Sequence, residues 1–425
     1  MDSFAFSVLF IVFLSLTLGC RFWLASRQIR HVQQHRAALP PQFSEKISLE
    51  SHQKAADYTI AKTKLGLVDL LIGAVVLLAL TLFGGLQFLS SHLIPVLGTG
   101  MTYQLGLLVS FTIITGLIDL PMDYYRQFVL EEKFGFNKMT VTLFFTDMIK
   151  NSLIGALIGL PLCWVVLTLM SSAGQWWWLY AWLVWSGFQL LMMVLYPTVI
   201  APLFNKFKPL DDDSLKQRIE GLMQRTGFAS KGLFVMDGSK RSAHGNAYFS
   251  GFGASKRIVF FDTLIERLAP QEIEAVLAHE LGHFKKKHIV KRITLIFILS
   301  LGFLALLGCL KQQVWFYTGL GVDPLIIGGT ANNDAMALLL FMLTLPIFTF
   351  FFAPISALTS RKHEFEADAF AAQHTSANDL VTALVKMYDD NASTLTPDPL
   401  HSTFYDSHPP ASIRINHLNQ QFSHS

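Results

Sequence analysis

Long apolar stretches without charged side chains alternate with polar, basic segments along the chain. A stretch of about 18 or more such residues is long enough to cross a membrane as a helix. Seven stretches of this length, with at most one charged residue near an end, predict seven membrane helices, at about residues 3–20, 66–88, 102–120, 153–171, 176–199, 292–310 and 336–358. The first is not preceded by basic residues, so we interpret it as a retained anchor rather than a cleaved signal peptide.

Lysine and arginine are unevenly distributed between the connecting segments. Segment 21–64 holds eight of them, segments 89–101 and 172–175 hold none, and segment 311–335 holds only Lys311. Because basic loops stay on the inner side of a membrane, this alternation predicts an outer N-terminus and an inner C-terminus. We therefore divide the chain into a membrane region with helices 1–5, an inside-facing segment, helices 6 and 7, and a second inside-facing segment, at residues 1–199, 200–291, 292–358 and 359–425.

The composition narrows the class of protein further. Hydrophobic residues make up 52% of the 425-residue chain and charged residues only 15%, which argues against a disordered chain. The net charge of +3 is too small to suggest nucleic acid as a partner. The three cysteines lie in or beside apolar stretches and form no pattern typical of a disulfide framework or a metal cluster. The sequence thus predicts a mainly α-helical, multi-pass membrane protein.

The strongest chemical signal is the pentapeptide His279-Glu280-Leu281-Gly282-His283 in the first inside-facing segment. Residues four apart share one face of a helix, so both imidazoles can bind one metal ion with the glutamate beside them as a base. The preceding residues, from Pro270 onward, predict the start of a helix with an apolar face formed by Ile273, Val276 and Leu277. The motif is typical of zinc-dependent hydrolases.

A catalytic zinc ion usually has three protein ligands and one open position. The best source of a third ligand is the charged stretch from Ser360 to Ala371, directly after the last apolar stretch. Helical spacing places two sets of side chains on different faces: Arg361, Glu364 and Asp368 on one, and His363, Glu366 and Phe370 on the other. Spacing alone does not choose between these faces.

Both parts of the candidate site are close in sequence to membrane helices. Nine residues separate His283 from Arg292, where the sixth apolar stretch begins, and Glu364 follows the seventh stretch closely. We therefore expect the reaction to occur at the inner face of the membrane, on a substrate bound to or delivered by the membrane. Contacts with lipid headgroups are expected for the basic run Lys285-Lys286-Lys287.

Two further segments have weaker interpretations when they are considered alone. Residues 246–261 are typical of two short strands around a glycine-rich turn. Such a hairpin either binds an extended peptide at its edge or is purely structural, and the pattern does not decide. His408 and the two prolines after it are typical of a rigid turn.

Taken together, these segments resemble the type I CAAX prenyl endopeptidases, which are seven-helix membrane zinc metalloproteases. The resemblance rests on the His-Glu-Leu-Gly-His motif, the pattern of residues 360–371, and His408-Pro409-Pro410 followed by Arg414. Residues 130–137 and 246–249 are also similar to family segments. The resemblance implies a ring of seven long helices around a large chamber, capped on the inside by a zincin-type protease domain that contains a small β-hairpin.

The resemblance also assigns roles to individual residues. It implies one zinc ion per chain, bound by His279, His283 and Glu364, with Glu280 as the general base. Supporting positions around the metal would be Asp368, which would orient a ligand histidine, and Arg361. It further implies that substrate is bound by two groups of residues: His408 and Arg414, which would also stabilise the oxyanion, and Asn246, Ala247 and Tyr248, which would pair with the substrate backbone.

The expected substrate is a peptide or protein, possibly prenylated, and membrane lipids are the expected surroundings. One alternative is a broad-specificity stress-type membrane zinc protease that degrades misfolded membrane proteins. A seven-helix receptor or transporter is another, but the apolar stretches nearly lack the ionisable residues of a transport pathway. The chain has no C-terminal endoplasmic reticulum retrieval signal and is short for a eukaryotic member. We therefore expect a bacterial inner membrane with the active site on the cytoplasmic side, the endoplasmic reticulum being the alternative. The sequence leaves the oligomeric state open.

Overall fold

The computed structural model describes residues 1–230, 232–250, 257–327, 330–331 and 333–422. Within this part of the chain, seven helical segments are long and apolar enough to cross a membrane, which confirms the predicted number. Their bounds are Ser3–His35 (α1), Leu49–Leu80 (α2), Met101–Glu131 (α4, Met101–Tyr125, and a following π-helical segment), Val141–Ser172 (α5), Gly174–Phe204 (containing α6, Trp177–Leu195, and α7, Ala201–Phe204), His288–Leu310 (α11) and Asp334–His374 (α13, Asp334–Thr349, and α14, Ala353–His374).

Several helix bounds differ from the predicted ones. The helix α2 begins at Leu49 rather than 66, where the Ser48 hydroxyl caps it by accepting a hydrogen bond from Ser51 N at 3.0 Å. It ends at Leu80, and the predicted connecting segment 89–101 is mostly helical, in α3 (Gly85–Leu97). The break between α2 and α3 instead includes Gly84, whose φ of +77° favours glycine. The charge-free stretches of the sequence therefore predicted the apolar part of each helix but not the polar residues that extend it.

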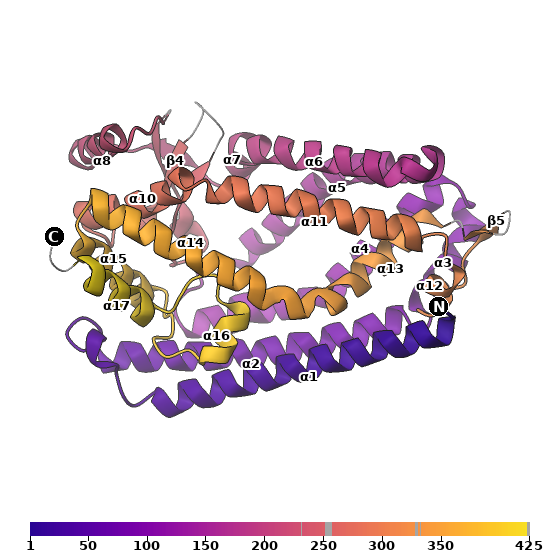
Figure 1. Cartoon of the computed structure of the whole chain (residues 1–425), viewed down its shortest axis with the longest axis horizontal. Helices are drawn as coiled ribbons and strands as arrows, with labels where there is room; N and C mark the ends of the chain where they lie inside the picture. The colour runs from indigo at the N-terminus through magenta and orange to yellow at the C-terminus, as the bar shows by residue number, and fades with distance from the viewer. Residues whose placement is uncertain (231, 251–256, 328–329, 332, 423–425) are drawn as a thin grey trace.

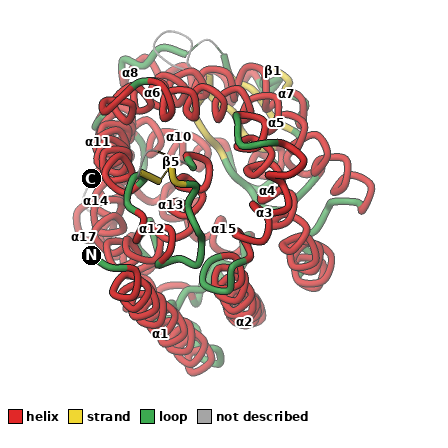
Figure 2. Tube along the Cα trace, turned by 90° about the vertical axis from the view of Figure 1, so that its right-hand side faces the viewer, coloured by secondary structure: helices red, strands yellow, loops and turns green. Residues whose placement is uncertain are grey.

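The long helices run along the longest axis of the molecule (Figure 1) and surround a common centre in the end-on view (Figure 2). A tightly packed bundle would bury a continuous stripe on each helix. In the most apolar windows of α2, α11 and the spans 101–131 and 174–204, only 6% of residues are buried. These helices therefore leave most of their side chains unpacked, as expected for a ring and not for a compact bundle.

A small sheet lies at one end of the ring. It contains four strands in the order β1 (Phe207–Pro209), β2 (Leu233–Met236), β4 (Arg257–Phe261) and β3 (Ala247–Ser250). Strands β3 and β4 pair antiparallel, which confirms the predicted hairpin; its turn, at 251–256, is outside the described residues. Among the described strands, β3 pairs only with β4, so it forms an edge of the sheet.

The helix α10 (Pro270–Lys285) lies at the centre of this end of the molecule. It contacts α8 (Asp213–Thr226), β3, α14 and α15 (Ala377–Asp390). The sequence predicted one apolar face, but the whole run from Glu272 to His279 is buried. The buried carboxylates have basic partners: Glu272 binds Lys386 at 2.8 Å, and Glu274 binds both Arg218 and Arg225.

Shorter elements complete the structure. Two C-terminal helices, α16 (Pro399–Tyr405) and α17 (Ala411–Phe422), pack against α14. Further short elements are the helix α9 (Asp262–Ile265) after β4 and the helix α12 (Val314–Thr318) after α11. The strands β5 (Ile326–Ile327) and β6 (Thr330–Ala331) form a two-stranded sheet. The boundary that we predicted at residue 358 falls inside α14. The seventh span and the polar stretch after it are thus joined by one helix.

Candidate metal centre

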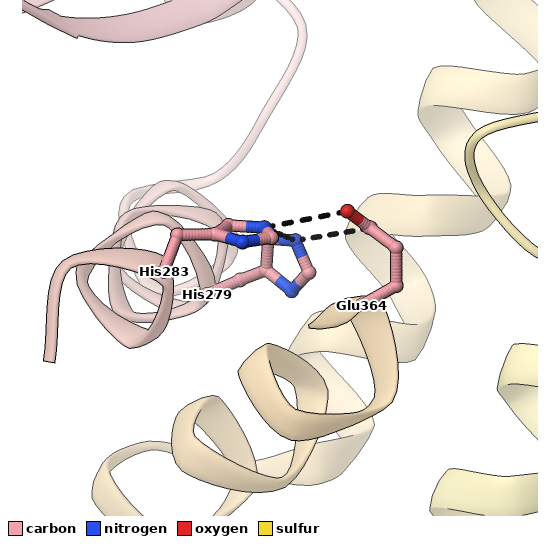
Figure 3. Close-up of side chains that lie close together, drawn as sticks. All are labelled: His279, His283 and Glu364. Carbon is pink, nitrogen blue, oxygen red and sulfur yellow. Dashed lines mark hydrogen bonds and ion pairs between the residues drawn. The ribbon is translucent and has the colours of Figure 1, made fainter. Parts of the chain in front are cut away.

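The structure brings together two histidines of α10 and one glutamate of α14 (Figure 3). The two Nε2 atoms of His279 and His283 lie 3.2 Å apart. Each is 3.4 Å from a carboxylate oxygen of Glu364, the first from Oε2 and the second from Oε1. The structure therefore chooses between the two faces of the polar stretch: the face with Glu364 is the one that meets the histidine motif.

The geometry and the chemistry of these three residues fit a bound metal ion. Two imidazole nitrogens bound to one tetrahedral zinc ion lie about 3.3 Å apart, close to the spacing found here. Glu364 is buried, and its Oε2 atom has no hydrogen-bond partner among the described residues. A buried carboxylate oxygen without a donor is costly, and a cation between the three side chains would satisfy it.

A second carboxylate supports His279 from behind. Asp368 is completely buried, and its Oδ1 atom lies 2.8 Å from His279 Nδ1. Burial disfavours the charged imidazole, but the neighbouring carboxylates of Asp368 and Glu364 outweigh it and raise the pKa of His279 to about 9. The site therefore favours positive charge at this imidazole, and a metal ion would have to compete with a proton for it.

The two arginines of the predicted site lie in different places. Arg414 is buried and binds Asp368 with two nitrogens, Nε at 2.9 Å and an Nη at 2.5 Å. Its other Nη is 3.7 Å from Glu364, so the guanidinium charge stabilises the carboxylates of Asp368 and Glu364. Arg361 donates instead to the carbonyl oxygen of Ser402 at 3.0 Å, which links α14 to α16.

Two further residues of the predicted site, Glu280 and His408, are partly exposed. Glu280 lies between the two histidines on α10 and is partly exposed, whereas the residues on either side of it are buried. His408 precedes α17, and its side chain is 61% exposed while its Nε2 atom is 3.4 Å from Glu364. Both positions suit groups that meet a substrate.

The predicted substrate-binding residues lie on and next to the edge strand. The Asn246 carbonyl accepts a hydrogen bond from Phe261 N at 2.9 Å, and its side-chain oxygen accepts one from Ala247 N at 2.8 Å. Tyr248 is partly buried on the sheet, and burial raises the pKa of its hydroxyl to about 12. Strand β3 thus has one backbone edge that no other described strand covers.

The contact between α10 and α14 depends on Gly282. A Cβ atom at this position would lie 2.9 Å from the backbone Cα of Ala367 and 3.1 Å from Cβ of Phe370. Backbone atoms do not rotate away, so any side chain here would push the two helices apart. Gly282 therefore sets the distance between the histidines and Glu364.

We predict that Gly282→Ala weakens metal binding and lowers the melting temperature, because over-packing of this kind costs about 1–3 kcal/mol. Gly302→Ala is the matched control, since a Cβ there would meet no atom within 4 Å. The measurements are zinc affinity and thermal unfolding in detergent. Equal values for the two variants would show that the close approach of α10 and α14 does not set the site.

The sequence did not indicate a further histidine beside the trio. His288 Nδ1 lies 3.0 Å from His283 Nδ1, although the two residues are five apart. On a continuous helix this spacing would place them on different faces. The chain instead breaks between α10 and α11, where Lys287 has a φ of +56°, and the sequence pattern carries no signal for that break.

Seven membrane-length helices in the described part of the chain and a largely buried histidine–histidine–glutamate trio define an integral membrane metallopeptidase. Residues 28–206 match the family described as "CAAX prenyl protease N-terminal, five membrane helices", and residues 209–421 match "Peptidase family M48". The chain belongs to peptidase family M48, which confirms the resemblance and the expected metalloendopeptidase class.

Relatives match over almost the whole chain. It is 35% identical to "CAAX prenyl protease 1" of Saccharomyces cerevisiae, over 93% of this chain and 91% of that one. It is 32% identical to "CAAX prenyl protease 1 homolog" of Homo sapiens, over 95% and 93%. The solved structure "Crystal Structure of S. mikatae Ste24p" matches with a TM-score of 0.89 and 33% identity, over 97% and 99%. These relatives are eukaryotic and lend no support to the expected bacterial origin.

Proposed function

We propose that the chain is a zinc-dependent endopeptidase that cleaves the C-terminal end of prenylated CAAX proteins at the inner face of the membrane. The observation that carries the proposal is the trio of ligand atoms, all within 4.8 Å of one another, with Glu280 between the two histidines. The printed names of the relatives support the class of substrate.

In the proposed mechanism, His279, His283 and Glu364 would hold a zinc ion, and a bound zinc ion would supply the Lewis acidity that lowers the pKa of a water molecule and polarises the scissile carbonyl. Glu280 accepts a proton from that water and passes it to the leaving amine. Its partly exposed position leaves room for both tasks. Asp368 and Arg414, which are buried, keep the His279 ring in one orientation.

Substrate is proposed to bind along β3. The open edge of β3, the strand that begins at Ala247 directly after Asn246 and includes Tyr248, would pair with an extended peptide by strand addition. His408, exposed beside Glu364, would donate a hydrogen bond to the oxygen on which negative charge develops. Arg414 is buried against Asp368, so we assign it to the support of this site and not to direct contact with substrate.

The site is joined directly to the membrane helices. The helix α11 begins five residues after His283, and Glu364 lies on the continuous helix α14 of the seventh span. The basic segments around the site support a location on the inner side, as the positive-inside rule predicts. A lipid-modified peptide end would reach such a site without leaving the membrane surface.

The test is cleavage of a farnesylated CAAX peptide by the purified protein in detergent, with products identified by mass spectrometry. The expected result is cleavage after the farnesylated cysteine, lost on chelation and restored by zinc. The same peptide without the farnesyl group is the control. Equal cleavage of both peptides would favour the broad-specificity protease, and cleavage of neither would contradict the proposed substrate class.

A further inference from the structure

A tight break in the chain between α10 and α11 brings the first residue of α11 beside the metal centre. Only Lys286 and Lys287 separate α10 from α11, and Lys287 has the left-handed conformation, with φ +56° and ψ +32°. This conformation is unfavourable for a residue other than glycine. The turn places His288, the first residue of α11, beside His283 on the side away from Glu364.

His288 joins three helices at this point. It is buried, with 4% exposure, and its Nδ1 atom lies 3.0 Å from His283 Nδ1. Its other nitrogen, Nε2, lies 2.9 Å from Oε2 of Glu366 on α14. Its ring also stacks on His363, with centroids 3.9 Å apart and an angle of 14°. Glu366 and His363, on the face of α14 that does not carry Glu364, thus contact His283 indirectly, through the ring of His288.

The hydrogen bonds allow one consistent placement of protons. Nε2 of His283 faces the other two ligand atoms, so a neutral His283 that binds a metal carries its proton on Nδ1. That proton is donated to His288 Nδ1, which leaves the His288 proton on Nε2. The latter is donated to the Glu366 carboxylate, an acceptor only. Each nitrogen or oxygen atom in this series of hydrogen bonds then acts either as a donor or as an acceptor.

We infer that His288 and Glu366 form a hydrogen-bond relay that orients His283, so that each zinc-binding histidine is held by a carboxylate of α14. His279 is held directly, by Asp368, and His283 is held at one remove, by Glu366 through the ring of His288. His288 and Glu366 are therefore positioning residues. The inference rests on the proposed zinc site and adds a second support to it.

The test is the zinc affinity of the full-length protein in detergent, measured by competition with a coloured chelator. His288→Phe keeps a flat ring against His363 but removes both hydrogen bonds, and we expect the affinity to fall about 10- to 100-fold. His288→Asn places an amide oxygen near the former Nδ1 position and is expected to recover part of the loss. Glu366→Ala, at a side chain that is 31% exposed, is expected to give an intermediate loss.

The matched control is His374→Phe. His374 is another histidine of α14 that stacks on an aromatic ring, that of Phe370, and its described hydrogen bond is to the Phe370 carbonyl. We expect this variant to bind zinc as the unmodified protein does.

The outcomes separate the relay from the site that it supports. Unchanged affinity in His288→Phe overturns the relay. If that variant does not fold, unchanged affinity in Glu366→Ala overturns it equally. If the unmodified protein binds no zinc, the proposed function itself fails. Loss in His288→Phe with partial recovery in His288→Asn supports the relay, because a packing role alone would be met better by phenylalanine than by asparagine.

Discussion

Replacing Glu280 by glutamine is expected to abolish peptide hydrolysis while the metal stays bound. Glutamine has nearly the same shape but does not accept a proton from water at neutral pH. Loss of a general acid–base group lowers turnover by about 100- to 10,000-fold. The expected ligand atoms of His279, His283 and Glu364 are unchanged by the substitution, so zinc content should remain that of the unmodified protein.

Turnover of the farnesylated peptide and bound zinc are measured on the same preparation of Glu280→Gln. The control is Glu220→Gln, at an exposed glutamate of α8 that has no part in the site. We expect the control to keep both activity and zinc. Robust cleavage by Glu280→Gln would contradict the proposed role of this carboxylate, even if zinc were present at one ion per chain.

Removal of the Arg414 side chain is expected to have the largest effect on stability. The substitution Arg414→Ala leaves Asp368, which is completely buried, without its two guanidinium hydrogen bonds. An uncompensated buried charge of this kind costs about 3–5 kcal/mol. Because Asp368 also holds His279, we expect weaker zinc binding together with a lower melting temperature.

The control for this prediction is a similar pair at the surface. Arg36 binds Asp57 through two nitrogens, but the two side chains are 33% and 45% exposed. Water replaces the lost partner there, so Arg36→Ala should lower the melting temperature much less than Arg414→Ala does. Thermal unfolding in detergent compares the two variants. Equal melting temperatures would show that the buried pair contributes no more than a surface one.

The number of membrane helices and the pair of candidate histidine ligands were predictable from the sequence pattern, whereas Glu364 was assigned only through the family resemblance. Charge is so costly within a membrane that charge-free stretches locate its apolar part. The spacing of His279 and His283 fixes a shared helical face, which α10 has. These features depend on local composition and spacing, which a single sequence contains.

The features that were not predicted depend on contacts between distant segments. Helix α14 continues from the membrane through Glu364, whereas the apolar pattern ends at residue 358. Arg414 was expected to meet the substrate, but it is buried against Asp368, 46 positions away in the chain. His288 reaches His283 only because of the left-handed residue Lys287. Neither the contact between Arg414 and Asp368 nor the turn at Lys287 produces a periodic pattern in the sequence.

The measurement that tests the account most directly is the amount of zinc bound per chain, determined by elemental analysis of the purified protein. We predict one zinc ion in the unmodified protein and in Glu280→Gln. We predict none in His279→Ala, His283→Ala or Glu364→Ala, each of which removes one of the three ligand atoms. Absence of zinc from the unmodified protein, or full occupancy in all three ligand variants, would contradict the account.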